Sequence, residues 1–132
     1  MGGGNYFIEY LKNTNCYIIW DKRGNLPEVP FMDMEFAWTN FTKKAKKYIC
    51  INHGFIKDDK AKIEHPTQKP LKLFFDILKD FSKEDNLILD CFAGSGVTGV
   101  ASLRLNRKCI LIEKEKKYCD IIVRRLGLRK FL

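Results

Sequence analysis

A short apolar run followed by a glycine-rich turn is the feature that most constrains how this chain folds. Residues 86–90, NLILD, have the length and apolar content of a buried strand. Residues 91–96 read CFAGSG, and a helix is predicted directly after them, over 97–105. Gly94 and Gly96 allow the backbone to turn tightly and to approach a ligand closely. A strand, a glycine turn and a helix in this order are typical of a ligand-binding α/β sheet.

The rest of the second half of the chain supports the same fold class. Apolar residues at helical spacing predict a helix over 70–81, where Pro70 suits the first helical position. A second strand is expected over 109–112 and a last helix over 118–126. Helix, strand, helix, strand and helix in succession predict a doubly wound α/β sheet.

The first half of the chain is predicted to consist mainly of strands. Strands are expected over three ranges, 16–20, 34–39 and 48–52. The first two of these suggest a hairpin with a long loop, preceded by one or two helical turns over 6–11. The polar segment 52–64 predicts a loop. Three aromatic side chains are interpreted as core rather than as a surface for stacking bases, Trp20, Phe36 and Trp38.

Length and composition exclude several classes of protein. The chain has 132 residues, of which 45% are hydrophobic, so it fits one domain with a real core rather than a disordered chain. No apolar run approaches the roughly 20 residues of a membrane span, and the N-terminus does not resemble a signal peptide. The five cysteines are scattered without a C-x-x-C pair. We therefore expect reduced thiols, packed as small apolar residues in a cytoplasmic protein, and no metal site.

The charge balance is basic, with 24 Lys and Arg against 16 Asp and Glu and a net charge of +8. This excess fits a polyanionic partner such as nucleic acid, and it fits a solvated surface equally well. The run TKKAKK contains Lys43, Lys44, Lys46 and Lys47, which are candidates for phosphate contacts or for a solvated face. The charged residues at 21–23, DKR, could face DNA or form a solvated turn.

An acidic residue in the second half points to the kind of ligand. Glu113 comes just after the second strand, about where nucleotide-type sites place a carboxylate that accepts hydrogen bonds from ribose hydroxyls. The first amides of the helix after the glycine turn suit an anionic group. These features predict a cofactor that carries a nucleoside. Because Gly99 completes a G-x-G-x-x-G pattern, the spacing alone does not exclude NAD.

Together the motifs resemble the DNA amino-methyltransferases that use S-adenosylmethionine, in their β-ordered group. HPTQKP at 65–70 resembles motif X of that group, DCFAGSG motif I and LIEKEKKY motif II. Upstream, GGNYFIEYL, IIWDK and MEFAWTNF resemble phage-type adenine methyltransferases of restriction-modification systems. The resemblance covers nearly the whole chain. It implies a partial Rossmann-like methyltransferase fold and methyl transfer to adenine N6 in double-stranded DNA, with adenine favoured over cytosine N4 only by the HPTQKP context.

The resemblance also assigns residues to roles. It implies a set of cofactor-site residues, His65, Thr67, Lys69, Asp90, Phe92, Gly94, Ser95, Gly96, Thr98 and Glu113. Thr67 and Lys69 would reach the methionine carboxylate, Thr98 would add a hydroxyl near it, and Glu113 would hold the ribose. His65 would contact the cofactor or satisfy a neighbouring backbone group. Cys91 stands where the family most often has proline, and we interpret it as a packing residue.

The catalytic motif of that family is missing from this sequence. It has the form Asp/Asn/Ser-Pro-Pro-Tyr/Phe/Trp, and none of the four prolines here are adjacent, so no catalytic residue is assigned. In β-ordered relatives the motif precedes GGNYF. We therefore expect a truncated form, with 1–64 as a sheet hairpin and DNA-recognition region and 65–132 as the cofactor-binding half. The alternatives are a non-catalytic cofactor- or DNA-binding remnant, one half of a two-chain or homo-oligomeric methyltransferase, and an NAD-dependent enzyme.

Overall fold

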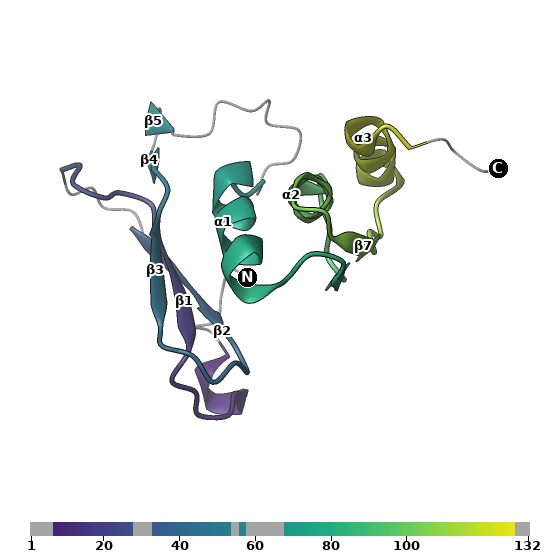
Figure 1. Cartoon of the computed structure of the whole chain (residues 1–132). Coiled ribbons are helices and arrows are strands. Elements are labelled where there is room, and N and C mark those ends of the chain that lie inside the picture. The colour runs from purple at the N-terminus through teal and green to yellow at the C-terminus, as the bar shows by residue number, and fades with distance from the viewer. Residues whose placement is uncertain (1–6, 28–32, 54–55, 58–67, 129–132) are drawn as a thin grey trace. The chain divides into compact units, whose positions relative to one another are not determined.

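The computed structural model describes residues 7–27, 33–53, 56–57 and 68–128 (Figure 1). The chain divides into two compact units, Met1–Asp59 and Lys60–Leu132, and each is described by itself. This division lies a few residues before the boundary expected at 64/65. Within the described residues, no helix is both long enough and apolar enough to cross a membrane.

The first unit is built on a three-stranded sheet in the order β2-β1-β3. It begins with a short 3-10 helix, Ile8–Tyr10, and its strands are β1 (Tyr17–Asp21), β2 (Met34–Trp38) and β3 (Lys46–Ile49). β1 pairs with β2 in antiparallel fashion, which confirms the predicted hairpin, and with β3 in parallel. β3 begins earlier than predicted, because Lys46 and Lys47 already pair with Ile18 and Ile19 of β1. A short ladder of β4 (Asn52–His53) and β5 (Ile56–Lys57) lies within the segment predicted to be a loop.

The core of this unit is centred on Trp20, which is 1% exposed. Its Nε1 donates a hydrogen bond of 2.8 Å to the carbonyl oxygen of Cys50. Trp38 is half-buried, and its Nε1 donates to the carbonyl oxygen of Lys12 at 2.7 Å. Phe36 is 37% exposed, so the core interpretation holds for Trp20 and is wrong for Phe36.

The charged turn after β1 is ordered by its own contacts rather than by solvent. Asp21 Oδ1 accepts hydrogen bonds from the backbone N–H groups of Arg23 and Gly24, at 3.1 and 2.7 Å. Burial alone raises the Asp21 pKa, but these bonds and the ammonium of Lys47 together hold the pKa below its usual value. Two ion pairs close the turn, Lys22–Glu35 at 2.6 Å and Arg23–Asp33 at 2.7 Å. The interpretation of residues 21–23 as a solvated turn is therefore wrong.

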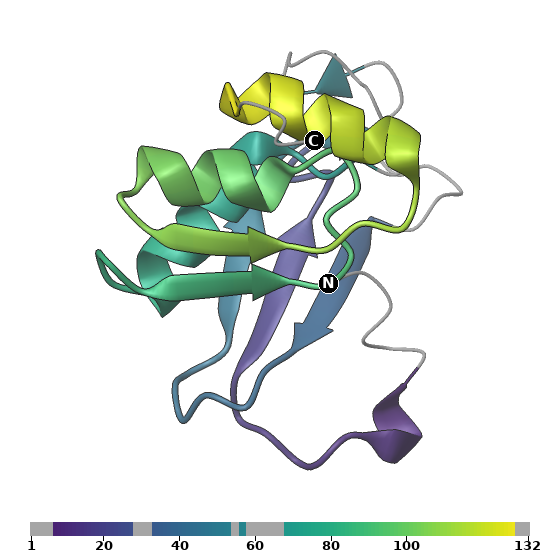
Figure 2. The same cartoon turned by 90° about the vertical axis from the view of Figure 1, so that its right-hand side faces the viewer.

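The second unit shows the predicted alternation of helices and strands. Its elements are α1 (Leu71–Phe81), β6 (Leu87–Asp90), α2 (Val97–Arg104), β7 (Lys108–Leu111) and α3 (Lys116–Leu126). β6 and β7 pair in parallel, with Leu89 opposite Ile110, and Figure 2 shows them side by side and pointing the same way. α2 contacts β7, α1 and α3, around a core that includes Leu73, Ala101 and Ile122. Pro70 caps α1 instead of occupying its first turn.

Within the described part of the second unit, one face of the two-stranded sheet is exposed and mostly apolar, with Lys108 opposite Leu87. Four side chains on it are about half exposed or more, Leu87 (60%), Leu89 (59%), Ile110 (48%) and Ile112 (51%). Parallel sheets are normally covered on both faces. The second unit is therefore consistent with a partial α/β methyltransferase fold, in which helices cover one side of the sheet.

Candidate functional site

The glycine turn between β6 and α2 has the backbone geometry that its sequence predicts. Gly94 and Gly96 have φ values of +53° and +76°, in the left-handed region that favours glycine. The Ala93 N–H donates to the carbonyl oxygen of Ile112 at 3.0 Å, which ties the turn to the end of β7. The Gly96 N–H donates to the carbonyl oxygen of Ala93 at 2.8 Å. Gly96 is the N-cap of α2 and makes no side-chain cap, so the helix begins with its first amides uncapped by a side chain.

Glu113 lies against this turn. Its Oε2 accepts a hydrogen bond of 2.8 Å from the Gly94 N–H, and its Oε1 accepts one of 2.8 Å from the Glu115 N–H. The carboxylate therefore joins the segment after β7 to the glycine turn. An ionised carboxylate only accepts hydrogen bonds, with about four acceptor positions over its two oxygens.

Asp90 and Thr98 form a second polar contact across the turn. Asp90 Oδ1 accepts from the Phe92 N–H at 3.0 Å, and Oδ2 accepts from the Thr98 hydroxyl at 2.5 Å. Thr98 is 6% exposed. The Thr98 hydroxyl donates its proton to Asp90 and so helps to orient that carboxylate, a contact that the sequence does not predict. A role of Thr98 toward a ligand stays a prediction.

The two residues that follow Asp90, Cys91 and Phe92, have exposed side chains. The Phe92 side chain is 92% exposed and offers an aromatic surface beside the turn. Cys91 is also exposed, so its interpretation as a packing residue is wrong. The expectation for cysteines holds for Cys16 and Cys50, which are buried in the first unit.

The segment that resembles motif X is only partly described. Lys69 is half-buried directly before α1, whereas His65 and Thr67 lie outside the described residues. Gln68 reaches the glycine turn, because its Oε1 accepts a hydrogen bond of 2.8 Å from the Ser95 hydroxyl. From α3, Arg125 Nη1 donates to the Ser95 carbonyl oxygen at 2.8 Å and to its Oγ at 3.0 Å. Sequence reasoning missed both residues. Only the position of Gln68 inside HPTQKP could have pointed to it.

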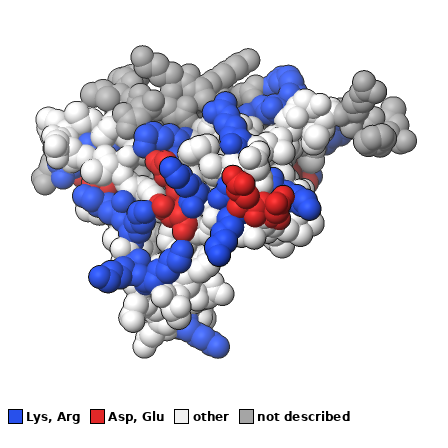
Figure 3. All heavy atoms as spheres, in the orientation of Figure 1, with Lys and Arg blue, Asp and Glu red and all other residues white. Residues whose placement is uncertain are grey.

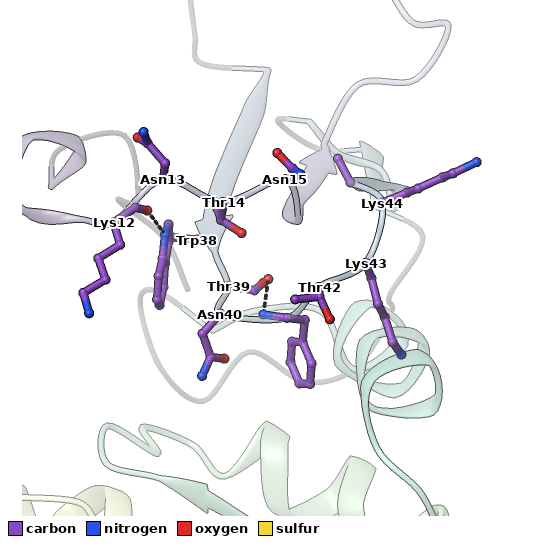
Figure 4. Close-up of a pocket in the computed structure, with 12 residues that line it drawn as sticks. Lys12, Asn13, Thr14, Asn15, Trp38, Thr39, Asn40, Thr42, Lys43 and Lys44 are labelled. Atoms are coloured by element: carbon purple, nitrogen blue, oxygen red, sulfur yellow. Dashed lines mark hydrogen bonds between the residues drawn. The ribbon is translucent and has the colours of Figure 1, made fainter.

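The predicted DNA-binding lysines lie in the first unit, where two of them, Lys43 and Lys44, line an open groove of about 760 Å³ (Figure 4). The groove is lined by twelve residues, Lys12, Asn13, Thr14, Asn15, Trp38, Thr39, Asn40, Phe41, Thr42, Lys43, Lys44 and Ala45. No carboxylate is among them. Lys46 and Lys47 lie instead on β3, where the Lys47 ammonium pairs with Asp21 at 3.3 Å. Basic side chains also spread widely over the face shown in Figure 3, with acidic ones among them.

Comparison with known proteins places both units in one family. A family described as "DNA methylase" matches residues 9–124. The chain is 45% identical over 122 residues to the type II methyltransferase M2.MboI of Moraxella bovis, and 33% identical over 123 residues to M2.LlaDCHI of Lactococcus lactis subsp. cremoris. These matches include 92% and 93% of this chain but only 44% and 46% of the relatives. The chain thus spans less than half the length of these curated relatives.

Solved structures show the same likeness. The complex of M1.HpyAVI with SAM has a TM-score of 0.66 and 30% identity, over 93% of this chain and 71% of that one. The cytosine-N4-specific PvuII DNA methyltransferase has a TM-score of 0.57 at 16% identity, over 95% of this chain and 62% of that one, which shows the fold alone.

The packing around Gly96 and Gly127 predicts that alanine substitutions at these two glycines differ in their cost to stability. A Cβ on Gly96 would lie 2.9 Å from Ile122 Cγ1, whereas a Cβ on Gly127, with φ +63°, would meet nothing within 4 Å. We expect Gly127→Ala to cost only the left-handed strain, about 1–2 kcal/mol. Gly96→Ala should cost about 1–3 kcal/mol more, because α3 must shift. Urea denaturation of both variants measures this difference, and equal losses would contradict the packing of Ile122 on the turn.

Proposed function

Because this chain belongs to the DNA methylase family (N6_N4_Mtase), we propose that residues 65–132 form the part of such an enzyme that binds S-adenosylmethionine. The observation that carries the proposal is the Glu113 carboxylate, held on the Gly94 amide at 2.8 Å. This contact supports a nucleoside site at the turn, since it holds beside the glycines a carboxylate of the kind that accepts hydrogen bonds from ribose hydroxyls. The similar M1.HpyAVI structure is a complex with SAM.

The residues around the turn fit this cofactor. The exposed Phe92 ring offers an apolar surface for the adenine base, and Asp90, Gly94, Ser95 and Gly96 shape the pocket. At the other end, the first amides of α2 suit the methionine carboxylate. By the resemblance, Thr67, Lys69 and His65 also belong to this part of the site, with Thr98 holding Asp90. When bound, S-adenosylmethionine supplies an activated methyl group, and these side chains orient it.

The reaction we propose for the whole enzyme is methyl transfer to the exocyclic amine of adenine, N6, in double-stranded DNA. The family and the type II methyltransferase relatives support DNA as the substrate. The choice of adenine over cytosine rests on the HPTQKP context. A DNA substrate is also compatible with the cytoplasmic location that the scattered cysteines, without a C-x-x-C pair, suggest.

A second candidate, one half of a two-part methyltransferase, is favoured by two observations. The sequence has no adjacent prolines, so it lacks the polar-Pro-Pro-aromatic motif that would hold a flipped base. The apolar sheet face formed by Leu87, Leu89, Ile110 and Ile112 is uncovered. We propose that the remainder of the domain, in the same or another polypeptide, covers this face and supplies the acceptor site.

For the DNA we propose contacts through Lys43, Lys44, Lys46 and Lys47. Lys43 and Lys44 line a groove that has no carboxylate on its walls, which supports an anionic partner there. Such lysines contact phosphates without reading base sequence. Because Lys47 pairs with Asp21, we expect this ion pair to reduce its contribution to DNA binding.

The first test of the proposal is binding of S-adenosylmethionine, measured by calorimetry. Glu113→Ala should weaken binding by about 1–3 kcal/mol, roughly 5- to 150-fold, because paired ribose hydroxyls lose their acceptor. Glu115→Ala is the matched control, since only the backbone N–H of Glu115 takes part in the Glu113 contact. NAD should not compete. Equal affinities for wild type and Glu113→Ala would remove Glu113 from the site.

The second test concerns methyl transfer itself. This chain alone should not transfer labelled methyl groups to mixed-sequence DNA, because no acceptor site holds a base in line with the cofactor. Addition of a separately expressed fragment of M2.MboI, comprising the part outside the match, should produce labelled N6-methyladenine after nucleoside digestion. Gly94→Trp in the cofactor turn should abolish that signal. Turnover by the single chain that Gly94→Trp abolishes would overturn the two-part proposal.

The third test is the salt dependence of DNA binding. Each phosphate contact contributes about 0.9 to the slope of log affinity against log salt. Lys43→Ala with Lys44→Ala should therefore lower this slope by about 2. Lys79→Ala with Lys83→Ala removes the same charge from exposed positions outside the groove and serves as the control. An equal fall in both double variants would show that net charge, rather than the groove, drives binding.

A further inference from the structure

Ser95 is the meeting point of three segments that are far apart in the sequence. Its side chain is 3% exposed, within the second unit. Arg125 Nη1 donates to both the carbonyl oxygen and Oγ of Ser95, at 2.8 and 3.0 Å. Because a guanidinium only donates, the Ser95 hydroxyl accepts from Arg125 and keeps its own proton for Gln68 Oε1, 2.8 Å away. The three side chains therefore form one directed chain of hydrogen bonds.

These hydrogen bonds help to fix the Ser95–Gly96 peptide bond, which lies at the start of α2. The Ser95 carbonyl oxygen is held by Arg125, and the N–H of the next residue, Gly96, donates to the carbonyl oxygen of Ala93 at 2.8 Å. Both ends of the Ser95–Gly96 peptide are thus fixed. Hydrogen bonds to a charged donor are the stronger ones, and linked hydrogen bonds polarise one another.

We propose that Arg125 is a positioning residue that couples the glycine turn, through Ser95, to Gln68 and Lys69. Gln68 directly precedes Lys69, so fixing the Gln68 side chain fixes the backbone from which Lys69 extends. Arg125 would then pre-assemble the two parts of the cofactor site before the cofactor arrives. The proposal rests on the proposed function for its consequence, but the coupling itself is a property of the free protein.

The rival explanation is that Arg125 only anchors the end of α3. That role would link Arg125 to Ser95 and leave Gln68 unaffected. The side-chain amide signals of Gln68 in a ¹⁵N NMR spectrum of the free chain distinguish the two. They should shift in Arg125→Met as they do in Ser95→Ala, and stay in place in the matched control Arg124→Met. Unchanged Gln68 signals in a folded Arg125→Met variant would overturn the coupling.

A double-mutant cycle on S-adenosylmethionine binding tests the consequence. Arg125→Met and Gln68→Leu should each weaken binding roughly 3- to 30-fold. The double variant should bind little more weakly than the weaker of the two single variants, because both substitutions break the same chain of hydrogen bonds. Arg125→Lys, which keeps one donor, should recover part of the loss. Losses that multiply would overturn the coupling. If wild type binds no S-adenosylmethionine, the proposed function fails, and the Gln68 signals still decide the coupling.

Discussion

The segments that follow the two parallel strands are held together at the glycine turn. Backbone hydrogen bonds join Ala93 to Ile112 and Ile112 to Asp90, and the Glu113 carboxylate adds a bond from the Gly94 amide. The second oxygen of Glu113 accepts from the Glu115 amide at the start of α3. This one side chain therefore contacts the glycine turn, the exit from β7 and the entry to α3. The same carboxylate is the group expected to meet a ribose, so site and fold share it.

Other polar residues near the turn also make several hydrogen bonds each. Asp90 accepts from the Phe92 amide and the Thr98 hydroxyl. Ser95 accepts from Arg125 and donates to Gln68. These contacts join the residues of the turn to one another and to neighbouring segments, which lowers the ordering cost of binding a ligand there. Loss of one such residue is therefore expected to change both local stability and cofactor affinity, which is why matched controls matter for reading either effect.

What the sequence could predict here follows from the range of the interactions. The roles of Gly94 and Gly96 in the turn are local, since glycine is the residue type that favours positive φ values. The helices and strands follow from the periodicity of apolar residues. Arg125 and Gln68 meet Ser95 only through packing of segments about thirty residues apart, which no spacing rule predicts. Cys91 is exposed rather than packed as the sequence predicts, because apolar residues on a turn can equally point outward.

The uncovered face of β6 and β7 explains why a complete enzyme needs more than these residues. Four large aliphatic side chains in a row on a parallel sheet are costly to leave in water, and such sheets are covered on both faces. The relatives are more than twice as long as the matched region, so their additional residues suffice to cover such a face. If one part of such a relative both covers this face and supplies the acceptor motif, packing of that part on the sheet is what brings the methyl donor and the base together.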